Sequence, residues 1–379
     1  MLKIGITGQA GFVGTHLYNT LGLYPEKYVR IPFEDEFFND NSRLENFVSQ
    51  CDVIVHLAAM NRHNDPQVIY ETNLGLVNKL IYACENTESV PHILFSSSTQ
   101  EERDNLYGKS KKEGRQLLEN WAARNKAKFT GFVIPNVFGP FGNPYYNSVV
   151  ATFCHQLTHN EQPKIEIDGE IKLIYVSELV HEIIQQIETA QNEPTDIEYI
   201  KTVPVNHTSQ IKVSDLLQKL SWYKENYFEK GIIPNLDDSF ERNLFNTFLC
   251  YIDHKSFFPF QLKLNTDDRG SFVETVKLNS GGQVSFSTTV PGITRGNHFH
   301  TRKAERFAVI KGKARIDIRK TGTEKILSFE LDGEKPSFVD MPVWFTHNIT
   351  NVGDEELYTI FWINEHYNPA DPDTFFEKV

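Results

Sequence analysis

Four side chains near the C-terminal end of the chain have the residue types and spacing of a metal site. His298 and His300 are two positions apart, so on a strand both point to the same face. Glu305 follows a short expected turn, and His347 would return from a distant strand. Three imidazoles and one carboxylate suit Zn²⁺, Fe²⁺ or Mn²⁺. A lone His-x-His pair is normally structural, but the full set favours a metal.

A tyrosine and a lysine four positions apart could perform acid–base chemistry. On a helix Tyr107 and Lys111 lie on one face, where the ammonium would lower the pKa of the phenol from about 10. The strand before them ends in serines and a threonine, so that Ser98, or alternatively Thr99, can hold a substrate oxygen. These features in this order predict a site that moves a proton onto or off a substrate oxygen.

Three glycines near the N-terminus predict a dinucleotide site. The first expected strand, residues 3–7, runs into Gly8, Gly11 and Gly14, and a helix-like segment follows. A tight turn and close approach of a pyrophosphate both require glycine, and the helix start offers N–H groups to phosphate. Arg30 stands where the second strand should end, and the acidic residues come only later. That order favours NADP over NAD.

The elements that must position these residues fall into two regions. Residues 1–200 alternate short apolar runs with longer periodic stretches, which predicts an α/β domain with a parallel, doubly wound Rossmann-type sheet. After about residue 250, short β-type runs separated by turn residues predict an all-β sandwich or jelly roll. We expect residues 1–245 and 246–379 to be the two domains, with residues 224–251 forming the last helices of the first domain and the connection.

Composition narrows the class of protein. The 379 residues are 40% hydrophobic and 23% charged, as in globular proteins with two domains. A net charge of −12 argues against a nucleic-acid partner. We found neither an apolar run of membrane-spanning length nor a signal peptide, so a cytoplasmic location without a membrane segment is expected. The four separated cysteines suggest reduced thiols rather than disulfides or a thiolate metal site.

The N-terminal motifs resemble the extended short-chain dehydrogenase/reductases. The shared strings are the glycine loop, His56-Leu57-Ala58-Ala59, Ser96-Ser97-Ser98, Tyr107-x-x-x-Lys111 and Asn136-Val137-Phe138-Gly139-Pro140. The resemblance implies that Tyr107 donates a proton, Lys111 assists it and contacts the nicotinamide ribose, and Ser98 positions the carbonyl. The expected cofactor contacts are Gly8, Gly11, Phe12, Val13, Gly14, Arg30, Ala58 and Lys111, with Asn136 expected at the substrate. Tyr107 follows Ser98 by nine positions, a shorter gap than the family usually has.

The C-terminal motifs resemble the cupin superfamily, and two strings also resemble the dTDP-sugar 3,5-epimerases. Those strings are Asp268-Arg269-Gly270-Ser271-Phe272-x-Glu274 and Gly292-Ile293-Thr294-Arg295-Gly296-Asn297-His298. The resemblance implies that Arg269 and Arg295 bind the nucleotide sugar. The histidine that those epimerases use as a base corresponds to His298, which we expect to be a metal ligand in this chain. A metal could instead act as a Lewis acid on a C4 ketone, with metal-bound water or a nearby carboxylate carrying the proton.

The whole chain resembles bifunctional bacterial enzymes of capsular polysaccharide or O-antigen synthesis. The resemblance implies that a zinc cupin epimerises C3 of a UDP-2-acetamido-2,6-dideoxy-hexos-4-ulose. The reductase domain would then reduce C4 with NADPH to UDP-N-acetyl-L-talosamine, a precursor of UDP-N-acetyl-L-fucosamine. It also implies a homodimer formed through helices of the first domain. Two alternatives stay open: a redox-neutral, NAD-dependent sugar-nucleotide epimerase or dehydratase with a structural cupin, and a non-enzymatic sugar-nucleotide sensor.

Overall fold

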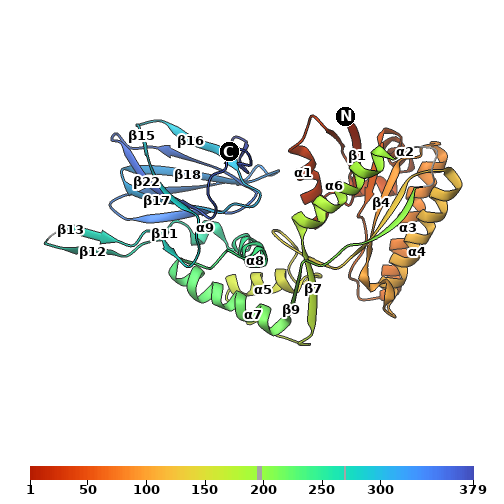
Figure 1. The fold of residues 1–379 in the computed structure, drawn as a ribbon, viewed down its shortest axis with the longest axis horizontal. Coiled ribbons are helices and arrows are strands. Elements are labelled where there is room, and N and C mark those ends of the chain that lie inside the picture. Colours follow the sequence, from red (N-terminus) through yellow and green to blue (C-terminus); the bar gives the residue numbers. More distant parts are fainter. Residues whose placement is uncertain (194–198, 269) are drawn as a thin grey trace. The chain divides into compact units, whose positions relative to one another are not determined.

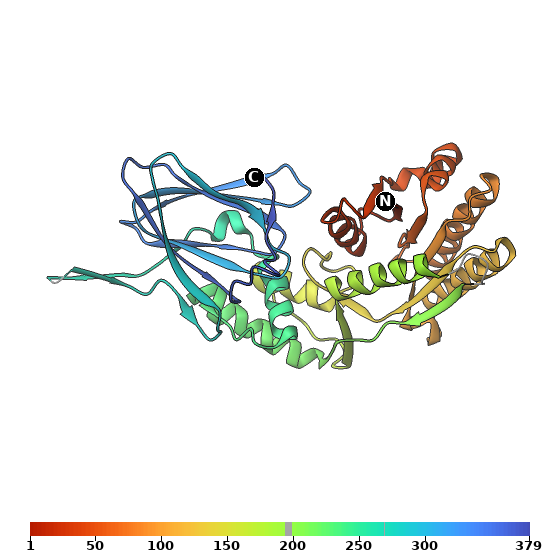
Figure 2. The ribbon, with the colours of Figure 1, turned by 45° about the horizontal axis from the view of Figure 1, so that its top comes forward.

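The structure is a computed structural model that describes residues 1–193, 199–268 and 270–379. These residues form two compact units (Figures 1 and 2). Unit 1 consists of Met1–Phe138, Gly142–Val149 and Glu170–Ile211, and unit 2 consists of Gly139–Phe141, Val150–Gly169 and Lys212–Val379. Each unit has its own hydrophobic core. None of the described helices is both long and apolar enough to cross a membrane.

Unit 1 contains a six-stranded sheet in the order β2-β1-β3-β4-β5-β8, in which every pair is parallel. Its strands are β1 (Leu2–Thr7), β2 (Tyr28–Ile31), β3 (Val53–His56), β4 (His92–Ser98), β5 (Phe129–Ile134) and β8 (Ile200–Pro204). The chain passes from β1 to β2 on one side and then returns to β3 on the other side. This reversal of strand order opens a crevice at the carboxyl ends of the strands, where open α/β sheets bind ligands. The predicted parallel sheet is confirmed.

Helices cover both faces of this sheet (Figure 1). They are α1 (Phe12–Gly22), α2 (Asn41–Gln50), α3 (Pro66–Asn86), α4 (Leu106–Asn125) and α6 (Val176–Asn192), with short 3-10 turns η1 (Asp35–Asn39) and η2 (Thr99–Glu102). Apolar residues of α2, α3 and α4, such as Phe47, Leu80 and Trp121, pack on one face. Leu17 of α1 and Ile183 of α6 pack on the other. Burial on both faces explains why the strands read as continuous apolar runs.

A second small sheet in unit 1 extends the end of β5. It contains β6 (Asn136–Phe138), β7 (Glu170–Tyr175) and β9 (Ser209–Lys212) in the order β6-β7-β9. Since β6 follows β5 after one residue, this sheet holds Asn136 just beyond the carboxyl edge of the main sheet. The Asn136 side chain donates to the Lys172 carbonyl over 3.3 Å.

Unit 2 is built on two antiparallel five-stranded sheets packed around one apolar core (Figure 2). The first contains β11 (Phe260–Gln261), β20 (Ser337–Met341), β17 (Glu305–Lys311), β22 (Leu357–Ile363) and β15 (Gln283–Thr289). The second contains β19 (Ile326–Asp332), β18 (Lys313–Lys320), β21 (Phe345–Asn351), β16 (Thr294–Phe299) and β23 (Phe375–Phe376). The predicted all-β architecture of cupin type is confirmed.

Several shorter elements complete unit 2. They are the helices α5 (Val149–Thr158), α7 (Val213–Trp222), α8 (Ser239–Leu249) and α9 (His254–Phe257), the π-helical turn η3 (Tyr223–Phe228), the strands β10 (Ile232–Ile233) and β14 (Lys277–Leu278), and the hairpin of β12 (Leu264–Asp267) and β13 (Gly270–Val273). The hairpin projects away from the two sheets in both views (Figures 1 and 2).

The segment expected to end the first domain, residues 224–251, groups with unit 2 instead. A buried ion pair explains this. Arg306 donates to both carboxylate oxygens of Asp340 over 2.7 and 2.9 Å, and the Tyr227 hydroxyl donates to the same carboxylate over 2.5 Å. Arg306 also donates to the carbonyl of Gly231. The last change from unit 1 to unit 2 along the chain therefore comes at 211/212, and two earlier segments also belong to unit 2. The domain boundary at 245/246 stays a prediction.

Candidate functional site

Unit 1 contains a cavity of about 1000 Å³ at the carboxyl ends of its strands. Ten of the predicted site residues lie in its wall. They are Gly8, Gly11, Phe12, Val13, Gly14, Ala58, Ser98, Tyr107, Lys111 and Asn136. The cavity therefore brings the glycine loop, the Tyr–Lys pair and the predicted substrate asparagine to one place.

The glycine loop leaves no room for side chains. Gly8 has a φ of +70°, and a Cβ there would lie 2.8 Å from the Ala58 nitrogen. A Cβ on Gly14 would lie 2.2 Å from the Gly8 carbonyl oxygen. Helix α1 starts directly after Gly11 and has no side-chain cap. Its first backbone N–H groups thus remain available to an anion in the cavity, as a pyrophosphate site requires.

Helix α4 presents Tyr107 and Lys111 to the cavity opposite the end of β4. Asn105 caps the helix, since its side chain accepts from the Gly108 nitrogen over 2.7 Å. The Lys111 ammonium donates to the Ser96 hydroxyl over 3.4 Å and lies over the Phe95 ring at 4.9 Å. Ser98 and Tyr107 are hydrogen-bonded to each other. A carbonyl oxygen placed against these two hydroxyls would have two hydrogen-bond donors.

The electrostatics of the pair differ from the sequence-based expectation. Burial raises the pKa of Tyr107 to about 12, and the nearby Tyr146 adds to the rise, while the Ser98 hydrogen bond opposes it. Burial lowers the pKa of Lys111 to about 8. The expected lowering of the Tyr107 pKa is therefore wrong for this state of the protein, because loss of hydration raises the pKa and Lys111 is not among the groups that shift it. The phenol keeps its proton at neutral pH, as a proton donor must.

A partly buried ion-pair network supports the short loop between Ser98 and Tyr107. Arg115 donates to both carboxylate oxygens of Glu101 over 3.0 and 2.9 Å, and the Ser97 hydroxyl also donates to Glu101. A Cβ on Gly108 would lie 1.9 Å from the Gln100 carbonyl oxygen, so η2 packs directly on the first turn of α4. The ion pair of Arg115 with Glu101 and the contact between η2 and α4 thus hold the shortened loop in place.

Arg30 does not lie in the cavity wall. Its guanidinium lies over the Tyr18 ring at 4.2 Å and donates to the Tyr18 carbonyl over 3.0 Å. The predicted cofactor contact of Arg30 is therefore unsupported, because packing on α1 holds the side chain. The wall instead contains Asp35 and Lys79, and the Lys79 ammonium donates to the Phe38 carbonyl over 2.8 Å.

Residues 142–148 contribute wall residues that the sequence analysis did not include. Gly142, Asn143, Tyr146, Asn147 and Ser148 line the cavity. The Tyr146 hydroxyl accepts from the Asn61 backbone nitrogen over 3.2 Å, which joins this segment to the loop after β3. The sequence signal for these residues was a loop rich in glycine, proline and tyrosine directly after Pro140, because binding and catalytic residues often lie on loops.

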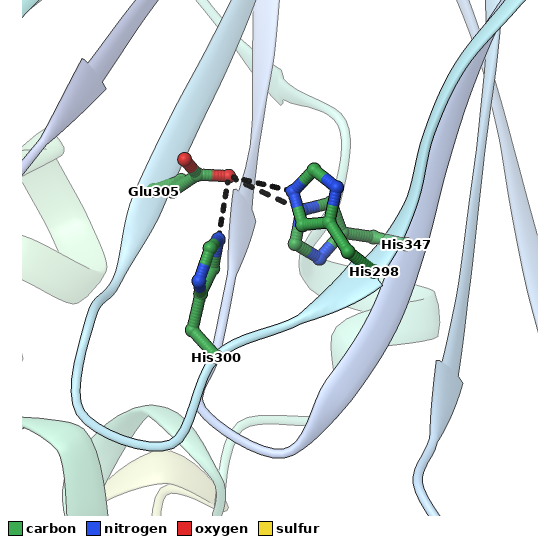
Figure 3. A group of neighbouring side chains, drawn as sticks. All are labelled: His298, His300, Glu305 and His347. Atoms are coloured by element: carbon green, nitrogen blue, oxygen red, sulfur yellow. Dashed lines mark hydrogen bonds and ion pairs between the residues drawn. The ribbon is translucent and has the colours of Figure 1, made fainter. Parts of the chain in front are cut away.

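Unit 2 brings the four predicted metal ligands together (Figure 3). Their ligand atoms all lie within 4.8 Å of one another. Oε2 of Glu305 is 3.1 Å from Nε2 of His347, 3.4 Å from Nε2 of His300 and 4.0 Å from Nε2 of His298. His298 and His347 are paired across β16 and β21, and Glu305 begins β17.

The chemistry of this set fits a divalent metal. His300, Glu305 and His347 are buried, and Nε2 of His300 makes no hydrogen bond within the described part of the chain. Burial lowers the pKa of His347, which favours the neutral imidazole that binds metals. Burial would raise the pKa of Glu305, but the three histidines outweigh it and hold that pKa well below its usual range. An orphan imidazole nitrogen facing a carboxylate is what a metal would satisfy.

The ligand nearest to solvent is His298, whose side chain is 24% exposed, compared with 4% for His300 and 1% for His347. The metal site therefore opens on the His298 side. The Nδ1 atom of His347 is hydrogen-bonded to the Phe345 carbonyl at 3.0 Å, which leaves Nε2 for a metal.

Of the two arginines predicted to bind the nucleotide sugar, Arg295 is not part of this cluster. Arg295 is exposed on β16, where it pairs with Ile349 of β21. Arg269 lies outside the described residues. Their roles stay predictions.

Comparisons with known proteins agree with the two-unit fold. Residues 4–199 match the NAD dependent epimerase/dehydratase family, and residues 265–375 match the polysaccharide biosynthesis C-terminal domain. The chain is 32% identical to a UDP-2-acetamido-2,6-beta-L-arabino-hexul-4-ose reductase of Pseudomonas aeruginosa, over 99% of this chain and 98% of that one.

Solved structures are similar as well. The capsular polysaccharide assembling protein CapF from Staphylococcus aureus is 35% identical, with a TM-score of 0.61 over the full length of both chains. UDP-glucose 4-epimerase of Thermotoga maritima is 18% identical over 59% of this chain and 83% of its own, with a TM-score of 0.51. At 18% identity, the likeness to the Thermotoga maritima enzyme shows only a shared fold over the matched part of the chain.

Proposed function

The chain belongs to the NAD dependent epimerase/dehydratase family, and we propose that it is a bifunctional sugar-nucleotide enzyme of capsular polysaccharide or O-antigen synthesis. Its cupin would epimerise C3 of a UDP-2-acetamido-2,6-dideoxy-hexos-4-ulose, and unit 1 would reduce C4 to UDP-N-acetyl-L-talosamine. The observation that carries the proposal is the presence of two separate reactive clusters in a chain that matches a UDP-ketosugar reductase over its full length.

The reduction is supported by the hydroxyl pair in the unit 1 cavity. The glycine loop would hold a nicotinamide cofactor, which would supply a hydride for C4. Tyr107 then gives its proton to the C4 oxygen, which Ser98 holds in place. The phenol is protonated before the step because burial raises its pKa to about 12. Lys111 stabilises the phenolate that remains after the transfer.

The epimerisation is supported by the histidine–glutamate cluster in unit 2. The C4 ketone acidifies the proton on C3, so epimerisation must come before reduction removes that ketone. When bound by His298, His300, Glu305 and His347, a divalent metal such as zinc supplies Lewis acidity that polarises the ketone. The partly exposed His298 side is where the sugar would approach. The buried ligands His300 and His347 hold the site rigid.

We propose NADPH as the hydride donor. Lys79 provides a cation in the cavity wall that could pair with a 2′-phosphate, the role first predicted for Arg30. Asp35 lies in the same wall, and a carboxylate there would accept the ribose hydroxyls of NADH. The ratio of kcat/KM with NADPH to kcat/KM with NADH therefore tests this choice. A ratio above about 10 supports NADPH, and a ratio below about 1 assigns the donor to NADH.

The proposed function is tested by incubating the protein with the UDP-4-ketosugar in D₂O, with and without NADPH. Without NADPH, we expect deuterium at C3 only. With NADPH, we expect a reduced C4 and one NADPH consumed per product, as followed by NMR and absorbance. Redox-neutral turnover would instead favour an NAD-dependent epimerase or dehydratase with a structural cupin. Binding without any turnover would favour a sugar-nucleotide sensor.

The rate of reduction should decline in alkaline solution. Burial lowers the pKa of Lys111 to about 8, so its ammonium loses its proton above that pH, whereas the Tyr107 phenol does not. We expect kcat/KM for reduction to fall up to about tenfold per pH unit above pH 8. A Lys111→Arg variant stays charged, so its residual activity should be level between pH 8 and 10. The same fall in that variant would assign the titration to another group.

A further inference from the structure

Residues 375–376 pair with β16, the strand that carries the proposed ligand His298 and ends one residue before His300. In β23, Phe376 pairs with His298 and Phe375 pairs with Phe299. The Glu377 nitrogen donates to the Asn297 carbonyl over 3.0 Å. This C-terminal segment, Asp371–Val379, is therefore held in register on β16.

We propose that Asp373 is a positioning residue for the metal centre, which sets the orientation of His300 and the turn that joins His300 to Glu305. This inference rests on the metal site of the proposed function. Asp373 is 73 residues from His300 in sequence, yet its carbonyl oxygen is 2.5 Å from Nδ1 of that ring. Asp373 is also almost fully buried, with 4% of its surface exposed.

The backbone carbonyl of Asp373 selects the His300 tautomer. An imidazole nitrogen that faces a carbonyl must carry the hydrogen, so Nδ1 donates to Asp373. The lone pair is then left on Nε2, the atom that points at Glu305 from 3.4 Å. Such an outer hydrogen bond orients a ligand ring and raises its basicity.

The carboxylate of Asp373 holds the turn between the two ligands. It accepts from three successive backbone nitrogens, those of Thr301 at 3.1 Å, Arg302 at 3.0 Å and Lys303 at 3.2 Å. The Thr301 hydroxyl adds a fourth donor at 2.6 Å. This turn connects β16 to β17, so it sets the separation of His300 from Glu305. Asp373 thus helps to position both the His300 ring and the Glu305 carboxylate.

A buried lysine helps to keep this residue in place. The Lys303 ammonium donates to the Pro372 carbonyl over 2.7 Å, one residue before Asp373. Arg302 pairs with Asp371 at 2.8 Å and with Glu365 at 3.2 Å on the exposed side of the turn, where solvent screens both pairs, so they contribute little to the position of Asp373. Asp373 itself adopts a positive φ of 41°, a conformation that few residues tolerate and that aspartate tolerates better than most. These contacts hold the C-terminal segment against the turn between β16 and β17.

The test compares Asp373→Asn with Asp371→Asn in the full chain. Asparagine would turn an NH₂ group toward backbone N–H donors, so the turn should loosen. We expect the affinity for Zn²⁺ to fall about 10–100-fold, which is the usual effect of removing an outer partner of a metal ligand. Asp371→Asn removes a carboxylate that lies two residues before Asp373 and belongs to an exposed ion pair. The Zn²⁺ affinity of this variant should stay within about twofold of wild type. Affinity is measured on chelator-stripped protein by competition with a chromophoric chelator.

The Co²⁺ absorption spectrum provides a second readout, since a displaced His300 should change the ligand-field bands in Asp373→Asn only. Equal Zn²⁺ affinity in both variants would overturn the positioning role while leaving the metal site intact. Failure of the wild type to bind Zn²⁺ would overturn the metal site itself. If Asp373→Asn does not fold, as judged by circular dichroism, Thr301→Val should still weaken Zn²⁺ binding several-fold. Wild-type affinity in Thr301→Val would then overturn the proposal.

Discussion

Tyr107→Phe is expected to lower the rate of ketone reduction about 10²–10⁴-fold, because it removes the proton that the C4 oxygen must receive. The change deletes one oxygen atom from a side chain in the cavity wall, so the cavity keeps its shape. Loss of C3 deuterium exchange is not expected, since we assign that step to the histidine–glutamate cluster of unit 2. The variant should therefore convert the ketosugar to its deuterated form and stop there.

The measurement is NADPH oxidation together with C3 deuterium incorporation by NMR. Tyr24→Phe is the matched control, because it deletes an exposed phenol hydroxyl in the same unit and should leave both readings unchanged. If Tyr107→Phe retained the wild-type rate of NADPH oxidation, another group would have to donate the proton, and the assignment of unit 1 chemistry to Tyr107 would be wrong.

His347→Ala is expected to abolish metal binding and with it C3 exchange. His347 is fully buried and provides the imidazole nearest to Glu305, at 3.1 Å. Without it, only two histidines remain around the buried Glu305 carboxylate, and the affinity for a divalent metal should fall below detection. Glu305→Gln tests the same site with almost no change in side-chain volume, so it separates loss of a ligand from loss of packing.

Metal content after dialysis and deuterium exchange at C3 are the two measurements. His366→Ala, which removes an exposed histidine from the same unit, is the control and should keep both. Reduction of ketosugar that has already been epimerised should persist in His347→Ala. Wild-type exchange in both His347→Ala and Glu305→Gln would exclude a metal-dependent epimerisation.

Much of the fold was predictable because it depends on local patterns. Continuous apolar runs between periodic stretches predicted the parallel sheet of unit 1, and the observed β1 matches the strand expected over residues 3–7 closely. Short β-type runs between turn residues predicted the antiparallel sandwich of unit 2. The grouping of residues 212–245 with unit 2 was not predictable, because it rests on the buried contacts of Arg306 with Asp340 and Gly231.

The sites divide in the same way. The spacing of His298, His300 and Glu305 already required two ligands on one strand face and a third after a turn. In contrast, the direction of the Tyr107 pKa shift depends on how much water the fold removes, and the position of Arg30 depends on its packing against Tyr18. Burial and packing involve atoms from separate elements, so no local pattern contains them.

By itself, then, the sequence determined the two clusters of reactive side chains and the kind of sheet that carries each, since residue type, spacing and period are properties of short segments. Only the tertiary structure decided which partners complete them. Asp373 meets His300 from 73 residues away. Glu101 and Arg115 hold the short loop before Tyr107 through a partly buried ion pair. Such contacts form only when the folded chain removes water from both partners and holds them at hydrogen-bonding distance.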